Sequence, residues 1–143
     1  MDLIPFIPKT ANYQIWYPED FIVDEDEKGI VSITSPESFS NLTLSCYSIK
    51  RSVTEAILQD FFREATENYT ASSEMKSVTT ENKIWLEGDF QRENIFWVWW
   101  VLSHSNQIIL ASVNSEKIID SADRHLFRFM IDKMEIYPVD IKE

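Results

Sequence analysis

The stretch KIWLEGDFQRENIFWVWWVLSHSNQIILASV, residues 83–113, decides the fold of this chain. It contains three runs with strand character, at residues 83–91, 95–103 and 107–113. Their connections centre on Arg92-Glu93 and His104-Ser105. Connections this short join antiparallel neighbours, because a parallel crossover needs about a dozen residues or more. The stretch therefore predicts an antiparallel meander.

The segments outside the meander follow from changes in hydrophobic period. Ser52 and Glu55 have the spacing of a capping box, and the apolar stripe behind them predicts a helix over residues 53–68. A second stripe predicts a helix over residues 121–136, which ends before Pro138. Alternating or β-branched runs predict further strands, at residues 13–17, 21–23, 30–34, 42–49 and 75–79. Strand block, helix, meander and helix together indicate an α+β fold in one domain, residues 1–143, with an antiparallel sheet of about six or seven strands and two main helices.

The middle strand of the meander, IFWVWWVL at residues 95–102, is apolar on both faces. A strand of this kind is usually central in its sheet and covered on both sides. Turns of even length would place Phe90 opposite Ile95 and Gly88 opposite Trp97. With this register one face of the sheet forms a core beneath the helices, and it carries Ile84, Leu86, Trp97, Trp99, Val101, Ile108 and Leu110. The other face carries Trp85, Phe96, Val98, Trp100, Leu102 and Ile109.

The second face needs a cover if both helices pack on the first, because each large apolar side chain left in water forgoes roughly 1.5–3 kcal/mol. Three arrangements would supply one. In the first, the face is covered internally, by residues 3–8, by residues 114–120 or by one helix on each side of the sheet. In the second, the face binds a second copy of the chain, as a homodimer, or another protein. In the third, the face forms a groove for a small ligand. The candidate interaction residues are Trp85, Phe96, Val98, Trp100 and Ile109.

The order of elements, the segment Tyr17-Pro18-Glu19-Asp20-Phe21 after the first strand, and the closing helix resemble PsbP-like domains over residues 10–137. That fold group includes photosystem accessory proteins, a small Ran-binding nuclear-transport factor and bacterial proteins. Its characterised members mostly bind or assemble other molecules without catalytic residues. The resemblance therefore implies binding rather than catalysis, and it transfers no site residue to this chain.

Composition excludes several classes of partner and cofactor. The chain has 24 acidic and 13 basic residues, a net charge of −11, which disfavours nucleic acids and anionic membranes. Two glycines cannot form a glycine-rich phosphate loop, and one cysteine with two histidines cannot complete a four-ligand zinc site. The acidic turn at residues 24–29 fails as a calcium loop, since Lys28 stands at a ligand position. We expect no cofactor, no metal and, without a signal-peptide pattern at the start, a cytoplasmic protein.

Catalytic residues also lack a supporting pattern. Cys46 lies on the apolar face of its strand, and His104 falls in a polar turn. The carboxylates Glu87 and Asp89 share one strand face, but such pairs carry no catalytic signal in so acidic a chain. The sequence thus predicts a non-catalytic binding or protein-interaction domain. The alternatives are a small hydrolase or lyase that uses His104 or His125 as its base, and a protein with a small-ligand pocket.

Overall fold

The computed structural model describes residues 2–10, 12–38 and 40–138 of the chain. The two helices are α1, Glu55–Ala65, and α2, Ser121–Lys133. Within the described residues there are eleven strands: β1 Leu3–Phe6, β2 Tyr13–Pro18, β3 Ile22–Glu25, β4 Val31–Thr34, β5 Asn41–Ser48, β6 Thr70–Ala71, β7 Lys76–Thr79, β8 Ile84–Arg92, β9 Ile95–His104, β10 Gln107–Ser115 and β11 Glu135–Ile136.

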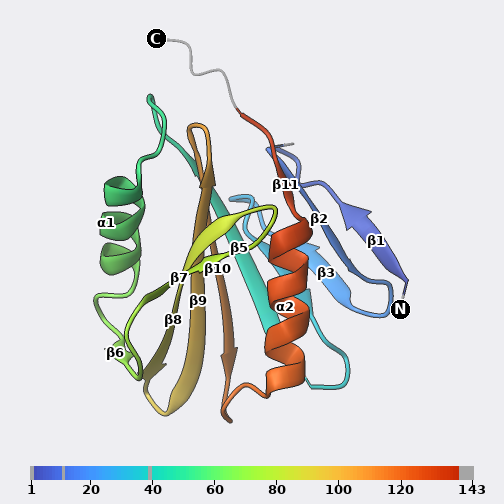
Figure 1. The fold of residues 1–143 in the computed structure, drawn as a ribbon. Coiled ribbons are helices and arrows are strands. Elements are labelled where there is room, and N and C mark those ends of the chain that lie inside the picture. Colours follow the sequence, from blue (N-terminus) through green and yellow to red (C-terminus); the bar gives the residue numbers. More distant parts are fainter. Residues whose placement is uncertain (1, 11, 39, 139–143) are drawn as a thin grey trace.

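The strands form two antiparallel sheets (Figure 1). The larger has eight strands in the order β3-β4-β5-β10-β9-β8-β6, with β7 pairing β8 beside β6. The smaller has the order β1-β2-β11. The α+β class with an antiparallel sheet is confirmed, but the predicted six or seven strands are too few. The three strands that match none of the predicted runs, β1, β6 and β11, have two to four residues, too short to show a period, and β1 also contains Pro5.

The turns of the meander set its register. Arg92 pairs with Ile95 and His104 pairs with Gln107, so each turn has two residues. Glu93 and Asn94 have φ of 53° and 66°, as hairpin turns of this length require. Gly88 therefore faces Trp99 rather than Trp97. The predicted register is shifted by two residues, and because side chains alternate with a period of two, every residue keeps its predicted face.

The helix ends differ from the predicted bounds. Helix α1 begins at Glu55 because Thr54, not Ser52, is its N-cap: the Thr54 hydroxyl accepts a hydrogen bond of 3.2 Å from the Ile57 amide. Helix α2 ends at Lys133, three residues before the predicted end. The chain turns extended there and pairs with β2 as β11, so pairing within the small sheet replaces the last helical turn.

The two helices lie on opposite sides of the large sheet (Figure 1). Helix α1 packs Leu58 and Phe62 against the face that includes Leu86 and Val101. Helix α2 and the small sheet cover the other face with the buried side chains of Phe127, Met130, Ile131, Tyr13 and Ile15. Strand β9 is central and enclosed on both sides, and the internal cover is one helix on each side together with the small sheet.

Candidate functional site

The five candidate interaction residues share one face of the large sheet, as predicted, but that face is the main core. Trp85, Val98, Trp100 and Ile109 are no more than 1% exposed beneath α2 and the small sheet. Only Phe96 is half-buried; it lies at the end of β9, beside a hollow of about 180 Å³. The expected exposed interaction face is corrected on this ground, because its side chains are already covered within the chain.

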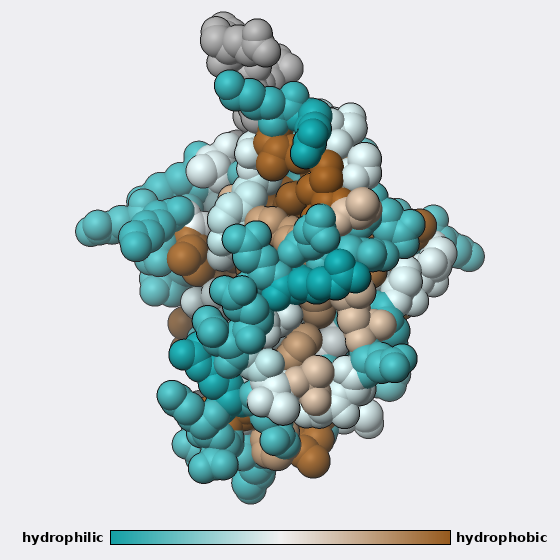
Figure 2. All heavy atoms as spheres, turned by 90° about the vertical axis from the view of Figure 1, so that its left-hand side faces the viewer, coloured by the Kyte–Doolittle hydropathy of each residue, from teal (hydrophilic) through white to brown (hydrophobic). Residues whose placement is uncertain are grey.

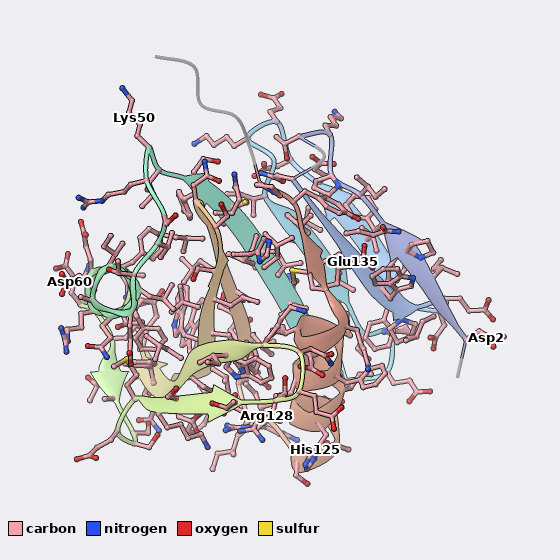
Figure 3. The ribbon with its side chains drawn as sticks, turned by 45° about the horizontal axis from the view of Figure 1, so that its top comes forward. Asp2, Lys50, Asp60, His125, Arg128 and Glu135 are labelled. Carbon is pink, nitrogen blue, oxygen red and sulfur yellow. The ribbon has the colours of Figure 1, made fainter. Side chains whose placement is uncertain are left out.

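A carboxylate lies inside this core. Glu87 is completely buried. Its Oε1 accepts hydrogen bonds from the Trp100 indole at 2.5 Å and from Arg128 Nε at 2.9 Å, and Arg128 Nη2 binds the second oxygen. Two further cations lie nearby, Lys76 at 3.5 Å and Arg124 at 3.7 Å. Figure 3 shows Arg128 reaching from α2 toward β7. The group therefore joins α2 to the sheet.

Charge and hydrogen bonding keep Glu87 ionised. Burial by itself would raise the pKa of this carboxyl, but the hydrogen bonds from Arg128 and Trp100 and the charges of Arg128 and Lys76 outweigh it and hold the pKa below its ordinary value. Both carboxylate oxygens are engaged by neighbouring donors. This geometry indicates a structural anchor rather than a catalytic acid.

The face beneath α1 holds an aromatic cluster. Trp97 and Trp99 stack with their ring centres 5.6 Å apart, and Tyr69 contacts both edge-on. Arg92 lies 5.2 Å above the Tyr69 ring. Figure 2 shows the side of the molecule that carries α1, where hydrophobic atoms appear in separate small areas among hydrophilic ones. This side therefore presents no continuous apolar patch to a partner.

The histidines and the cysteine do not meet. His125 is exposed on α2, with Nδ1 2.7 Å from the Ser121 carbonyl oxygen. Cys46 donates to the Gln107 side-chain oxygen at 3.1 Å, and burial raises its thiol pKa to about 12. His104 is exposed at the β9–β10 turn, and within the described chain its ring makes no hydrogen bond. The structure therefore brings neither histidine to a nucleophile.

His104 does line a concavity, which we call the seam cleft. This open cleft of about 810 Å³ lies where the end of α2, β11, the β7–β8 loop and the β9–β10 turn come together. Ile84 at its wall is 60% exposed, and the half-buried Ile136 adds further apolar surface. The full set of lining residues is 79–84, Ser103, His104 and 134–137. Sequence reasoning missed the cleft because it combines three distant segments.

Asp132, near the end of α2, holds one wall of the seam cleft in place. Its carboxylate accepts hydrogen bonds from the Thr80 hydroxyl and from the Asn82 amide, the latter at 3.1 Å. Its carbonyl oxygen accepts from the Lys83 ammonium at 2.6 Å. Burial lowers the Lys83 pKa below its ordinary value, although the charges of Asp132 and Glu135 act in the opposite direction. The β7–β8 loop is thus tied to the helix end and forms a preformed wall.

A second, more apolar concavity lies at the far end of α1. It has a volume of about 520 Å³, and Phe62, Phe90 and Met75 are among its lining residues.

In the acidic turn, Asp26 accepts hydrogen bonds from the amides of Lys28 and Ile30 at 2.8 and 2.9 Å. Its carboxylate therefore closes a hairpin turn, as in an ordinary solvated loop.

Two features are absent from the described part of the chain. No group of three or more histidine, cysteine, aspartate or glutamate side chains is arranged to hold a metal ion there. Neither of its helices has the length and apolar character needed to cross a membrane.

Comparison with known proteins identifies the fold. No protein-family model and no curated protein matches the chain. The solution structure of cyanobacterial PsbP (CyanoP) from Synechocystis sp. PCC 6803 superposes with a TM-score of 0.68 at 11% identity, covering 94% of this chain and 92% of that one. A crystal structure from Bacteroides thetaiotaomicron VPI-5482 matches with a TM-score of 0.65 at 15% identity; it covers the whole of this chain, which spans 52% of that protein. The chain therefore has a PsbP-like fold.

Proposed function

We propose that this chain is a non-catalytic binding domain, and that it binds a segment of a protein partner in the seam cleft. The observation that carries the proposal is the cleft itself. It combines an apolar wall at Ile84 and Ile136 with polar groups from the β7–β8 loop and the β9–β10 turn. An apolar surface with a few fixed polar groups around it is typical of binding sites.

The remaining surfaces support this choice. The aromatic face that first suggested binding is filled by α2, and the α1 side carries only small apolar areas. The buried carboxylate Glu87 is saturated by its own neighbours. A base at His104 would have a cleft to work in, but a catalytic mechanism also needs an activated nucleophile or a second acid, and among the described residues no such partner hydrogen-bonds its ring.

Selection of peptides on the immobilised chain tests the proposal. A displayed library of random short peptides is selected against the native chain, and the recovered peptides are measured on two variants. Ile84→Gln removes the apolar wall of the cleft. Ile22→Gln is the matched control, because Ile22 is 64% exposed on β3 and does not line the cleft.

Recovered peptides are expected to bind the Ile84→Gln variant at least about tenfold more weakly, since loss of one buried apolar side chain costs about 1.5–3 kcal/mol. The Ile22→Gln variant should bind like the native chain. Failure to recover any peptide, or recovery of peptides that ignore the Ile84 substitution, would remove the seam cleft as the site.

A further inference from the structure

We infer that the occupant of the seam cleft is a positively charged, extended segment of a partner protein. The inference rests on the proposed function and adds the chemistry of the partner. It is carried by the charge of the lining and by the main-chain groups that β11 directs away from β2.

The charges at the cleft favour a cation. Glu81 and Glu135 line it as exposed carboxylates, and Asp132 lies behind the loop wall. The last turn of α2 points its carbonyl groups here, which adds partial negative charge. Lys83 is the one lysine or arginine of the described lining, and its ammonium already donates to the Asp132 carbonyl. The balance at the cleft is therefore negative.

Lys133, which directly precedes the lining residues 134–137, does not neutralise the acidic groups of the cleft. Lys133 does not line the cleft; its ammonium sits 5.7 Å from the centre of the Phe129 ring, on the exposed side of α2. Glu135 accepts a hydrogen bond of 2.9 Å from the Tyr137 hydroxyl, which is not a cationic partner. The acidic rim thus has no basic side chain among the described residues that would neutralise it internally, beyond Lys83.

The backbone of β11 favours an extended segment. Strand β11 pairs only with β2 among the described strands, and Figure 1 shows the tip of the β9–β10 hairpin on its other side. The Tyr137 amide donates to the Asn12 carbonyl oxygen at 2.8 Å, toward β2. Because antiparallel ladders alternate, the N–H and C=O of Ile136 point away from β2. An added strand can bind these two groups while its apolar side chains rest on Ile84.

Titration of the full chain, labelled with ¹⁵N, tests the inference with three synthetic peptides, Ac-KVKVK-NH₂, Ac-QVQVQ-NH₂ and Ac-EVEVE-NH₂. The lysine peptide is expected to shift the amide signals of residues 80–84, His104 and Ile136. Its dissociation constant should rise about threefold or more between about 50 and about 300 mM NaCl, because salt screens exposed charges. The glutamate peptide should leave these signals unchanged.

A matched pair of variants assigns the charge effect to the cleft. Glu81→Gln with Glu135→Gln keeps the acceptor oxygens but removes both charges, and should weaken the lysine peptide about threefold or more. Glu64→Gln with Glu67→Gln makes the same change in net charge at and just after the end of α1, away from the cleft, and should have no effect. Equal binding of all three peptides in the cleft would overturn the cationic assignment and leave the binding role standing. Absence of cleft shifts with all three would overturn both.

Discussion

Replacement of Glu87 by glutamine should destabilise the fold strongly. Glutamine keeps the shape of the side chain and an acceptor for the Trp100 indole, but it removes the charge that faces Arg128. Breaking a buried ion pair from one side costs about 3–5 kcal/mol, because the remaining charge loses its partner in a poorly solvated place. Arg128 is 26% exposed, so water relieves part of this cost and the lower end, about 3 kcal/mol, is expected.

The same strand face supplies a control. Asp89 lies two residues further along β8 and pairs with Arg124 at 2.9 Å, but its side chain is 33% exposed. Asp89→Asn should therefore cost no more than about 1 kcal/mol. Urea unfolding followed by tryptophan fluorescence measures both changes. With a slope of about 1–3 kcal/mol per M, the Glu87 variant should lose about 1–3 M in its midpoint. Equal losses for the two variants would refute the reasoning.

The pH dependence of the same variant gives a second check. The Glu87 pKa is lowered in the folded state, whereas an unfolded glutamate has a pKa of about 4.3. Below this pH the unfolded chain binds more protons than the folded chain, so the stabilisation by Glu87 is complete above about pH 4.3 and is lost as the pH falls through the lower folded pKa. Glu87→Gln should abolish this part of the acid sensitivity. An unchanged acid profile would show that Glu87 does not carry it.

Three further substitutions and one chemical modification test local features. Gly88→Ala should cost about 1–3 kcal/mol in urea unfolding, since its Cβ would lie 2.8 Å from the Phe90 ring; no loss would mean that the ring moves freely. Thr54→Ala should lower the free energy of unfolding by about 1 kcal/mol, and Ser52→Ala should leave it nearly unchanged. A larger loss for Ser52→Ala would indicate that Ser52 is the N-cap. Cys46 should react with iodoacetamide at pH 8 at least about a hundredfold more slowly in the folded than in the urea-unfolded chain; comparable rates would contradict its raised pKa.

The strand faces were predictable from sequence, but their covers were not. Alternation within residues 83–113 assigned each side chain to a face, and the assignment tolerated the two-residue shift in register. Which helix covers which face depends on the path of the connections after β5 and β10, and amphipathic stripes contain no information about that path. Trp100 and Trp97 illustrate the result: Trp100, a candidate interaction residue, is completely buried, and Trp97, a residue of the predicted core face, is half-buried.

The position of Glu87 in the sequence indicates a buried ion pair, but the large number of acidic residues in the chain made it easy to overlook. Glu87 alternates in phase with Trp85 and lies opposite Trp100 on the neighbouring strand, and a carboxylate among such apolar residues needs a buried cation. Arg124 and Arg128, four residues apart on the same helix face, are the partners. The seam cleft had no comparable signal, since residues 79–84, His104 and β11 come together only through the tertiary fold.

The small sheet joins strands from opposite ends of the described chain, and this affects the order of assembly during synthesis. Strand β2 pairs with β11, and β5 pairs with β10, so the N-terminal strands find these partners only after residues 107–136 have left the ribosome. The meander β8–β10 pairs locally and is expected to fold first, because short loops close at the lowest entropic cost. Until then β2 can pair only with β1 and β5 only with β4, so their apolar residues lack the rest of the core. We therefore expect the nascent chain to need a chaperone most while only its N-terminal half has left the ribosome.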